Sequence, residues 1–272
     1  MKRALAVLSQ RRWLPVTLGL LLLVTVVVAL ALGAQDRSLD TIRNLGVLRV
    51  GLDPSFPPFE SLDATGQVMG YDVDLAQALA ARWGVRLQIE PIGFDGLLDA
   101  IWAGRVDMVI SALPLEPRLT RDLAYSQPYF DGGLFLVTRG DDTAIRQAND
   151  LADRRLAVEW GSDADAQGRQ LRTRLPGLQL VSLQTPAEAL AAVQSGAADA
   201  ALVDGVTARQ FVAHDPDAAL RIVETPVVSA PYVIAMPARA RALQRAVDEA
   251  LQAMRADNSL ARLEARWFAG QP

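Results

Sequence analysis

The chain has 272 residues, a formal net charge of −4 and 51% hydrophobic residues, which is enough apolar material for one large core or two smaller ones. It has no cysteine, which excludes disulfides, thiolate metal sites and a catalytic thiol. A single histidine, His214, excludes a histidine-based zinc site, and we expect neither a metal nor a cofactor. Basic residues form no run beyond the N-terminus, so we expect no nucleic-acid partner.

The first 35 residues predict an export signal or a membrane anchor. Four basic residues within the first 12 positions precede an apolar stretch from Leu14 to Leu32. That length approaches the ~20 residues of a membrane helix, and the positive charges keep the N-terminal end in the cytoplasm. Small residues at 31–34 suit signal cleavage, so a cleaved signal and an anchor formed by residues 13–34 both stay open. Either way, we expect the rest of the chain to lie outside the cytoplasm, in the periplasm or on the outer face of the membrane.

The next part of the chain alternates short apolar strands with amphipathic helices. Strands are predicted at 47–53, 85–91 and 106–113, and helices at 71–84 and 94–104. The helix at 71–84 has an apolar stripe and ends at Gly84, a residue typical of helix C-termini. Strands that alternate with helices in this way predict a parallel sheet.

The second half of the chain repeats this plan. Strands are predicted at 154–159, 178–183 and 198–204, and a helix at 185–196 has Thr185 as N-cap and Pro186 in its first turn. A helix–turn–strand unit recurs in the same frame, with five matching positions: Leu98 and Leu190, Ile101 and Val193, Gly104 and Gly196, Asp107 and Asp199, and Ile110 and Leu202. We interpret Asp107 and Asp199 as structural turn residues. The repeat predicts two similar α/β lobes.

Ligands of such sheets bind beyond the carboxyl ends of the strands, so the residues at those ends are the candidate site. In the first half they are Asp53, Phe56, Phe94, Ser111 and Ala112. In the second half they are Glu159, Trp160, Gly161, Ser162, Asp163 and Asp204.

Five stretches carry a resemblance to a known family: LRVGLDPSFPPFE, GQVMGYDVDLAQALAARWG, IGFDGLLDAIWAGRVDMVIS, AYSQPYF and GAADAALVD. Over residues 39–268 the sequence resembles the bacterial extracellular solute-binding proteins of family 3, the polar amino-acid receptors of ABC importers. The resemblance implies a two-lobed α/β fold of the type II periplasmic-binding-protein kind, with parallel or mixed sheets flanked by helices and a two-strand hinge. Lobe 1 would comprise residues 36–133 and 227–272, and lobe 2 residues 134–226. The crossings would fall near 132–137 and 224–228, and the terminal helices would pack on lobe 1.

The resemblance also implies roles for single residues. Asp53 and Phe56 would hold the ligand's side chain, Phe94 would stack on it, and Asp204 would bind the α-ammonium group. The turn at 161–162 would present backbone N–H groups to an α-carboxylate at a helix N-terminus. Other roles stay open: we expect Asp163 to be a helix N-cap rather than a ligand contact. Glu159 could face ligand or solvent, and Trp160 could be a ligand shelf or part of the core.

The stretch SALPLEPRLTRD (111–122) departs from the family pattern. Family members place hydroxyl residues here and then an arginine that clamps the ligand's α-carboxylate. In this chain Pro114 replaces a hydroxyl residue, and the arginine position falls on Leu119. Arg118 stands one residue short of it and remains the first choice for a ligand contact, with Arg121 as the second.

The surplus of carboxylates predicts the charge of the ligand. Unpaired buried carboxylates cost several kcal/mol after relaxation, so the ligand should bring positive charge. We predict a basic amino acid, or an amine or quaternary ammonium compound, captured by lobe closure and delivered by a monomer to an ABC permease. We predict no enzyme activity, but two alternatives stay open. One is a cyclohexadienyl-dehydratase-like enzyme with Glu159 or Asp163 as the acid, and the other is a sensory ligand-binding domain.

Overall fold

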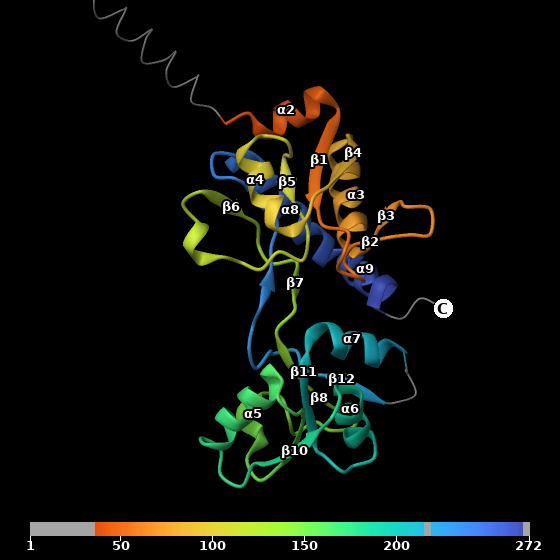
Figure 1. Ribbon diagram of the computed structural model, residues 1–272, viewed down its shortest axis with the longest axis vertical. Helices are drawn as coiled ribbons and strands as arrows, with labels where there is room; N and C mark the ends of the chain where they lie inside the picture. Colours follow the sequence, from red (N-terminus) through yellow and green to blue (C-terminus); the bar gives the residue numbers. More distant parts are fainter. Residues whose placement is uncertain (1–35, 215–218, 269–272) are drawn as a thin grey trace, which may run out of the picture. The chain divides into compact units, whose positions relative to one another are not determined.

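The computed structural model describes residues 36–214 and 219–268 (Figure 1). The predicted signal or anchor at residues 1–35 lies outside these residues. Within the described part of the chain, no helix combines the length and apolar character that a membrane span requires.

Lobe 1 is built on a five-stranded sheet with the order β4-β1-β5-β14-β6. Strands β1, β4 and β5 are parallel to one another, and β14 runs antiparallel to both β5 and β6. The strands are β1 (Val47–Leu52), β4 (Arg86–Pro91), β5 (Met108–Val109), β6 (Leu123–Tyr125) and β14 (Ala235–Pro237). Its other elements are α2 (Ser38–Leu45), β2 (Ser61–Leu62), β3 (Val68–Met69), α3 (Tyr71–Trp83), η1 (Phe94–Gly96), α4 (Leu97–Trp102) and η2 (Pro117–Leu119).

Lobe 2 is built on a second five-stranded sheet, with the order β10-β9-β11-β8-β12. Here β9, β10 and β11 are parallel, whereas β8 is antiparallel to β11 and β12. The strands are β8 (Leu134–Arg139), β9 (Arg155–Glu159), β10 (Gln179–Leu183), β11 (Ala200–Asp204) and β12 (Leu220–Ile222). The helices are η3 (Ala148–Leu151), α5 (Asp163–Arg172), α6 (Pro186–Gln194) and α7 (Gly205–His214).

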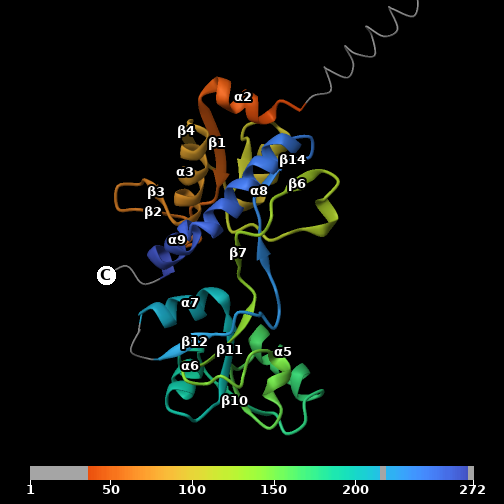
Figure 2. The ribbon, with the colours of Figure 1, turned by 180° about the vertical axis from the view of Figure 1, so that it is seen from behind.

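Two antiparallel segments connect the sheets. Strand β7 (Phe130–Asp131) pairs with β13 (Pro231–Tyr232), and just beyond them the N–H of Leu134 donates to the carbonyl of Val228 at 2.8 Å. Between these pairs, a Cβ on Gly133 would collide with the Val228 carbonyl oxygen, so only glycine lets the two segments approach this closely. Helices α8 (Arg241–Ala256) and α9 (Ser259–Phe268) lie along lobe 1 in both views, and they pack on α2 and α3 as predicted (Figure 2).

The sequence repeat appears in the structure as the same salt bridge in each lobe. At the start of β1, the Arg49 guanidinium meets Asp107 at 2.6 Å, and the Arg49 backbone N–H donates to the same carboxylate at 2.8 Å. At the start of β9, Arg155 contacts Asp199 in the same way, at 2.9 Å and 2.7 Å. Each aspartate therefore ties the turn after a helix to the neighbouring strand, which agrees with the structural role predicted for both.

Three details of the sequence-based assignment are corrected. The strand predicted at 106–113 is regular only at Met108–Val109, because the chain turns at Ala112, whose φ is 41°. The helix predicted at 94–104 begins with the 3₁₀ turn η1 before α4. Asp163 is not the N-cap of α5: Ser162 is the cap and its hydroxyl accepts from the N–H of Asp165 at 3.2 Å.

Candidate functional site

Five of the predicted residues line one cavity of about 320 Å³ in lobe 1. They lie beyond β1 and β5 and at the start of η1, because parallel strands place their carboxyl ends at one edge of the sheet. The cavity is lined by Asp53, Ser55, Phe56, Glu60, Phe94, Ser111, Ala112, Pro114 and Tyr232. Phe56 and Phe94 are 46% and 48% exposed, so each has surface available for contact.

Hydrogen bonds hold the polar wall of the lobe 1 cavity in place. The Asp53 carboxylate accepts from the backbone N–H of Phe94 at 2.9 Å, which links the end of β1 to the start of η1. The Asp53 backbone N–H donates to the hydroxyl of Ser111 at 3.0 Å. The same hydroxyl donates to the carboxyl group of Glu60 at 2.7 Å. Ser111 therefore positions both acids of the cavity.

Behind this wall lies a second buried acid, Asp72 at the start of α3. Its carboxylate accepts from the N–H of Ala112 at 2.6 Å and from the Tyr129 hydroxyl at 2.9 Å. Glu60 and Asp72 are 1% and 0% exposed. Burial raises the pKa of Glu60, and the adjacent charge of Asp72 raises it further; burial raises the pKa of Asp72 as well.

A second cavity, of about 200 Å³, lies in lobe 2 at the carboxyl ends of β9 and β11. It contains three predicted acids, Glu159, Asp163 and Asp204, together with Ser162. The Asp204 carboxylate accepts from the N–H groups of Val206 and Thr207 at 3.1 Å and 2.9 Å, so it also caps the first turn of α7. The remaining lining residues are Leu134, Ala164, Pro186, Leu202 and Val203.

The N-terminus of α5, expected to meet a ligand carboxylate, is largely satisfied from within the chain. The N–H of Gly161 donates to Asp165 at 3.1 Å, and the N–H of Ser162 donates to the carbonyl of Glu159 at 3.3 Å. Asp165 also pairs with Arg169 at 2.9 Å; that contact and the Gly161 N–H lower its pKa. The two N–H groups that were expected to receive a carboxylate, those of Gly161 and Ser162, are therefore already engaged within the chain.

Three predicted residues line neither cavity. Arg118 lies on η2 with its side chain 88% exposed and pairs with Glu116 at 3.3 Å. Trp160 is 65% exposed, and Gly161 has a φ of 77°, which lets the chain turn from β9 into α5. The structure thus divides the predicted set into a lobe 1 group, a lobe 2 group and these three. A ligand role for Arg118 stays a prediction.

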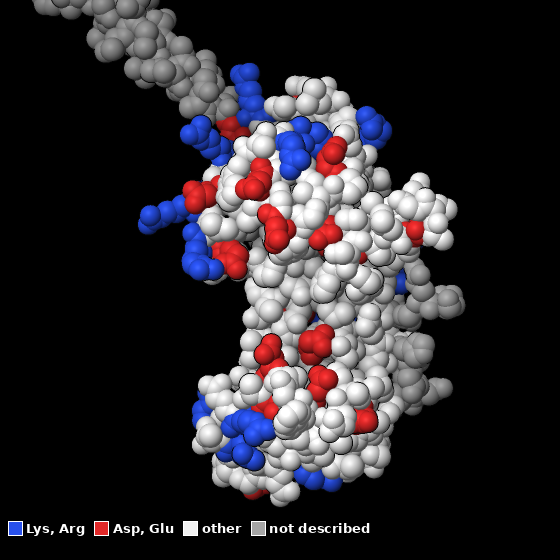
Figure 3. All heavy atoms as spheres, viewed as in Figure 1, with Lys and Arg blue, Asp and Glu red and all other residues white. Residues whose placement is uncertain are grey.

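Charge is unevenly distributed over the visible face of lobe 2. On the visible face of lobe 2, acidic side chains gather next to the connecting strands, and basic side chains lie at the opposite end (Figure 3). None of the residues that line either cavity is a lysine or an arginine. The described part of the chain also contains no cluster of three His, Cys, Asp or Glu side chains that could hold a metal ion.

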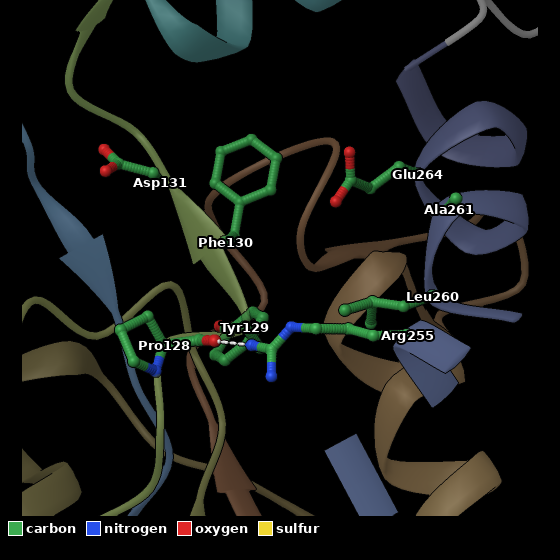
Figure 4. A pocket seen from close by; sticks show the side chains of 8 residues that line it. All are labelled: Pro128, Tyr129, Phe130, Asp131, Arg255, Leu260, Ala261 and Glu264. Carbon is green, nitrogen blue, oxygen red and sulfur yellow. Dashed lines mark hydrogen bonds between the residues drawn. The ribbon is translucent and has the colours of Figure 1, made fainter. Parts of the chain in front are cut away.

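A third cavity, of about 350 Å³, lies beside strand β7 and holds none of the predicted residues (Figure 4). Arg255 of α8 reaches across it and donates to the carbonyl of Pro128. Its wall includes Phe130 and Glu264, and both contact Arg209 of α7, at 4.4 Å from the Phe130 ring centroid and 3.5 Å from the Glu264 carboxylate. These contacts brace the connecting strand against α7, α8 and α9.

Two α/β lobes joined by paired strands, each with an acidic cavity at the carboxyl ends of its strands, define a two-lobed ligand-binding protein of the type II periplasmic-binding fold. Residues 48–270 match the bacterial extracellular solute-binding proteins, family 3, and the chain belongs to this family.

Known proteins of this fold include both binding proteins and an enzyme. The L-cystine-binding protein TcyJ of Escherichia coli K12 is 27% identical over 236 residues, which cover 86% of this chain and 87% of TcyJ. An ancestral cationic amino acid solute-binding protein is 30% identical with a TM-score of 0.56, covering 85% of this chain and 99% of that one. An ancestral cyclohexadienyl dehydratase is 25% identical with a TM-score of 0.72, covering 85% and 95%.

Sequence reasoning missed four polar residues of the lobe 1 site: Ser55, Glu60, Asp72 and Tyr232. Glu60 follows an apolar run, and Asp72 lies within the apolar face of a helix, so a charge in a hydrophobic context was the available signal. No comparable signal marks Tyr232, because β13 reaches the cavity through long-range pairing with β7 and with the segment around Pro114.

Proposed function

We propose that the protein captures a small cationic solute outside the cytoplasm by closing its two lobes, and delivers it to the permease of an ABC importer. One observation carries the charge of the ligand: acids line both cavities, and none of the lining residues is a lysine or an arginine. A ligand that bridges Asp53 in lobe 1 and Asp204 in lobe 2 must neutralise carboxylates that no lining residue of either cavity neutralises. The cationic amino acid binder among the similar structures supports this proposal.

The aromatic side chains of the lobe 1 cavity suit the same ligand. Phe56 and Phe94 stand beside Asp53 with about half of their surface exposed. An ammonium or guanidinium group over such a ring gains roughly 0.5–2 kcal/mol, and it gains more where a carboxylate also faces it. In this proposal Asp53 and the two rings hold the cationic end of the ligand.

The other end of the ligand meets lobe 2. Asp204 would bind an ammonium group there, whereas the N–H groups of Gly161 and Ser162, which were expected to receive an α-carboxylate, are already engaged. Arg118 is exposed and lines neither cavity, so it would have to move to act as a carboxylate clamp. The proposed ligands therefore include amines that lack an α-carboxylate, as well as basic amino acids.

Calorimetry with matched ligands tests both parts of this proposal. L-Arginine and agmatine share a guanidinium group, but only arginine has the α-carboxylate. We expect at least one of them to bind, and L-glutamate not to bind. If agmatine binds as tightly as L-arginine, the α-carboxylate contributes nothing. Tight binding of glutamate with no binding of arginine, lysine, agmatine or betaine would overturn the cationic ligand.

The similarity to an ancestral cyclohexadienyl dehydratase favours one alternative function, a dehydratase that acts on a ligand in the same fold. Glu159 and Asp163 line the lobe 2 cavity, and either could donate a proton to a leaving group. Incubation with prephenate and with arogenate distinguishes the two functions. A binding protein leaves both substrates unchanged, whereas turnover that is lost in Glu159→Gln or Asp163→Asn would establish the enzyme.

A further inference from the structure

Glu60 and Asp72, the two buried acids at the lobe 1 cavity, have two carboxyl oxygens without a hydrogen-bond donor in the described part of the chain. One oxygen of Glu60 accepts from Ser111, and one oxygen of Asp72 accepts from Ala112 and Tyr129. The other two oxygens, Oε2 of Glu60 and Oδ1 of Asp72, are buried and have no donor among the described residues. Leaving a buried charged oxygen without a donor costs more free energy than leaving a neutral polar group without one.

A single proton bound to one of the two carboxyl groups provides the missing hydrogen-bond donor. Consecutive residues hold the two carboxyl groups, Ser111 that of Glu60 and Ala112 that of Asp72, so the two acids are neighbours. Two neighbouring carboxyl groups can form a hydrogen bond with each other only when one of them is protonated. A shared proton converts one acceptor into a donor, and it also removes the repulsion between two adjacent negative charges.

Among the described residues, neither acid of the pair has a basic partner. Asp53, which follows β1, adds a further negative charge near Glu60. The Tyr129 hydroxyl donates to Asp72, Tyr232 lines the same cavity as Glu60, and burial raises the pKa of both tyrosines. No arginine among the described residues forms a hydrogen bond or ion pair with Glu60 or Asp72. The other charged or titratable groups on packed elements act on Tyr71 of α3, which faces Arg209 of α7, Arg255 of α8 and Glu264 of α9.

Glu60 is the member of the pair that reaches the cavity. It lines the cavity beside Asp53, Phe56 and Phe94, whereas Asp72 lies behind it. A cation in this cavity would approach the Glu60 carboxyl group. An ammonium or guanidinium group would then replace the proton, because it brings both a positive charge and hydrogen-bond donors.

We propose that Glu60 and Asp72 together hold one proton when no ligand is bound. They release this proton when the cationic end of the ligand binds, so the positive charge of the ligand replaces that of the proton. The O–H bond of the pair breaks, the proton leaves to solvent or buffer, and both carboxylates remain ionised opposite the cation. This inference rests on the proposed capture of a cationic solute. It adds that affinity for the cation rises with pH, by up to roughly tenfold per pH unit where one whole proton is released.

A first experiment determines, without any ligand, whether Glu60 and Asp72 hold a proton. Infrared difference spectroscopy at neutral pH, comparing wild type with Glu60→Gln, should show the carbonyl band of a protonated carboxyl group that the variant lacks. The amide in Glu60→Gln keeps an oxygen to accept from Ser111, so this variant should fold. Asp72→Asn keeps an acceptor for the Ala112 N–H and provides a second variant. Absence of a protonated carboxyl band in wild type would overturn the proposal.

The exchange is tested by calorimetry with L-arginine in phosphate and in Tris, whose heats of ionisation differ. We expect release of roughly one proton per ligand in wild type and none in Glu60→Gln. Binding without proton release would overturn the exchange while leaving the proposed function intact. If no cationic amino acid or amine binds, the proposed function fails. Guanidinium chloride, compared with sodium chloride, then serves as the cation: loss of the infrared band supports the exchange, and an unchanged band overturns it.

Discussion

At the scale of single residues, Asp204 shows how one side chain serves structure and site together. Its carboxylate caps α7 and also lines the lobe 2 cavity. Asp204→Asn keeps an amide oxygen for the cap but removes the charge. We expect the affinity for L-arginine to fall at least tenfold in calorimetry, because a desolvated charge pair is worth more than about 1.4 kcal/mol. We expect the melting temperature to change little.

A matched control for this variant is Asp141→Asn, which removes an exposed carboxylate that pairs with Arg139. It lies in the same lobe but lines neither candidate cavity, so arginine affinity should not change. Equal affinity in wild type and Asp204→Asn would remove Asp204 from the ligand site.

Residues at the end of a strand, or just after it, were the ones that the sequence could predict. Asp53, Ser111, Glu159 and Asp204 all lie in a cavity because strand ends share one edge of a sheet, and that edge follows from the strand pattern alone. Glu60 was missed because its place depends on Ser111, which lies 51 residues away in the chain. The position of Arg118 depends on a loop with two prolines, for which the sequence offers no periodicity.

At the scale of elements, helix α6 has the N-cap that the sequence predicted, Thr185. The Thr185 hydroxyl accepts from the N–H of Glu188 at 3.2 Å, and the Glu188 carboxylate accepts from the N–H of Gln184 at 2.8 Å. Thr185→Ala leaves one helix N–H without its partner, so unfolding in urea should show a loss of about 1 kcal/mol. Ser195→Ala, at the other end of α6, is the control and should cost less. A neutral Thr185→Ala would mean that water replaces the cap without penalty.

The junction between α8 and α9 predicts a pH dependence of stability. The Asp257 carboxylate accepts from the N–H of Ser259 at 2.8 Å and from Arg82 of α3 at 2.9 Å. Hydrogen bonds from Ser259, followed by that from Arg82, lower the pKa of Asp257 to about 2. Because the folded pKa lies below the unfolded one, this contribution is complete above about pH 4 and disappears as the pH falls toward about 2.

Asp257→Asn should therefore flatten the acid side of the stability profile. Urea midpoints measured between about pH 4 and about pH 2 should fall less steeply in the variant than in wild type. Asp99→Asn on α4, an exposed carboxylate without a recorded side-chain hydrogen bond among the described residues, is the control. The same acid slope in wild type and Asp257→Asn would contradict the role of this junction.

At the scale of the whole molecule, the repeated sequence pattern anticipated two similar α/β units, and the Arg49–Asp107 and Arg155–Asp199 pairs confirm the match. The antiparallel strands were harder to predict: β14 enters the first sheet from far along the chain, and β8 enters the second directly after the crossing. Their pairing is set by tertiary contacts, which a local pattern does not encode.

Capture by closure makes a prediction for the molecule as a whole. Each cavity is lined by residues of one lobe, so a ligand that touches both must bring Asp53 and Asp204 toward each other through the paired strands at Gly132–Gly133 and Val228. Small-angle X-ray scattering should show a smaller radius of gyration with saturating L-arginine than without it, and no change with L-glutamate. In Asp204→Asn the decrease should require more arginine, because the lobe 2 contact that stabilises the closed form is weaker. Arginine that binds by calorimetry without any decrease would show that one lobe binds the ligand without closure.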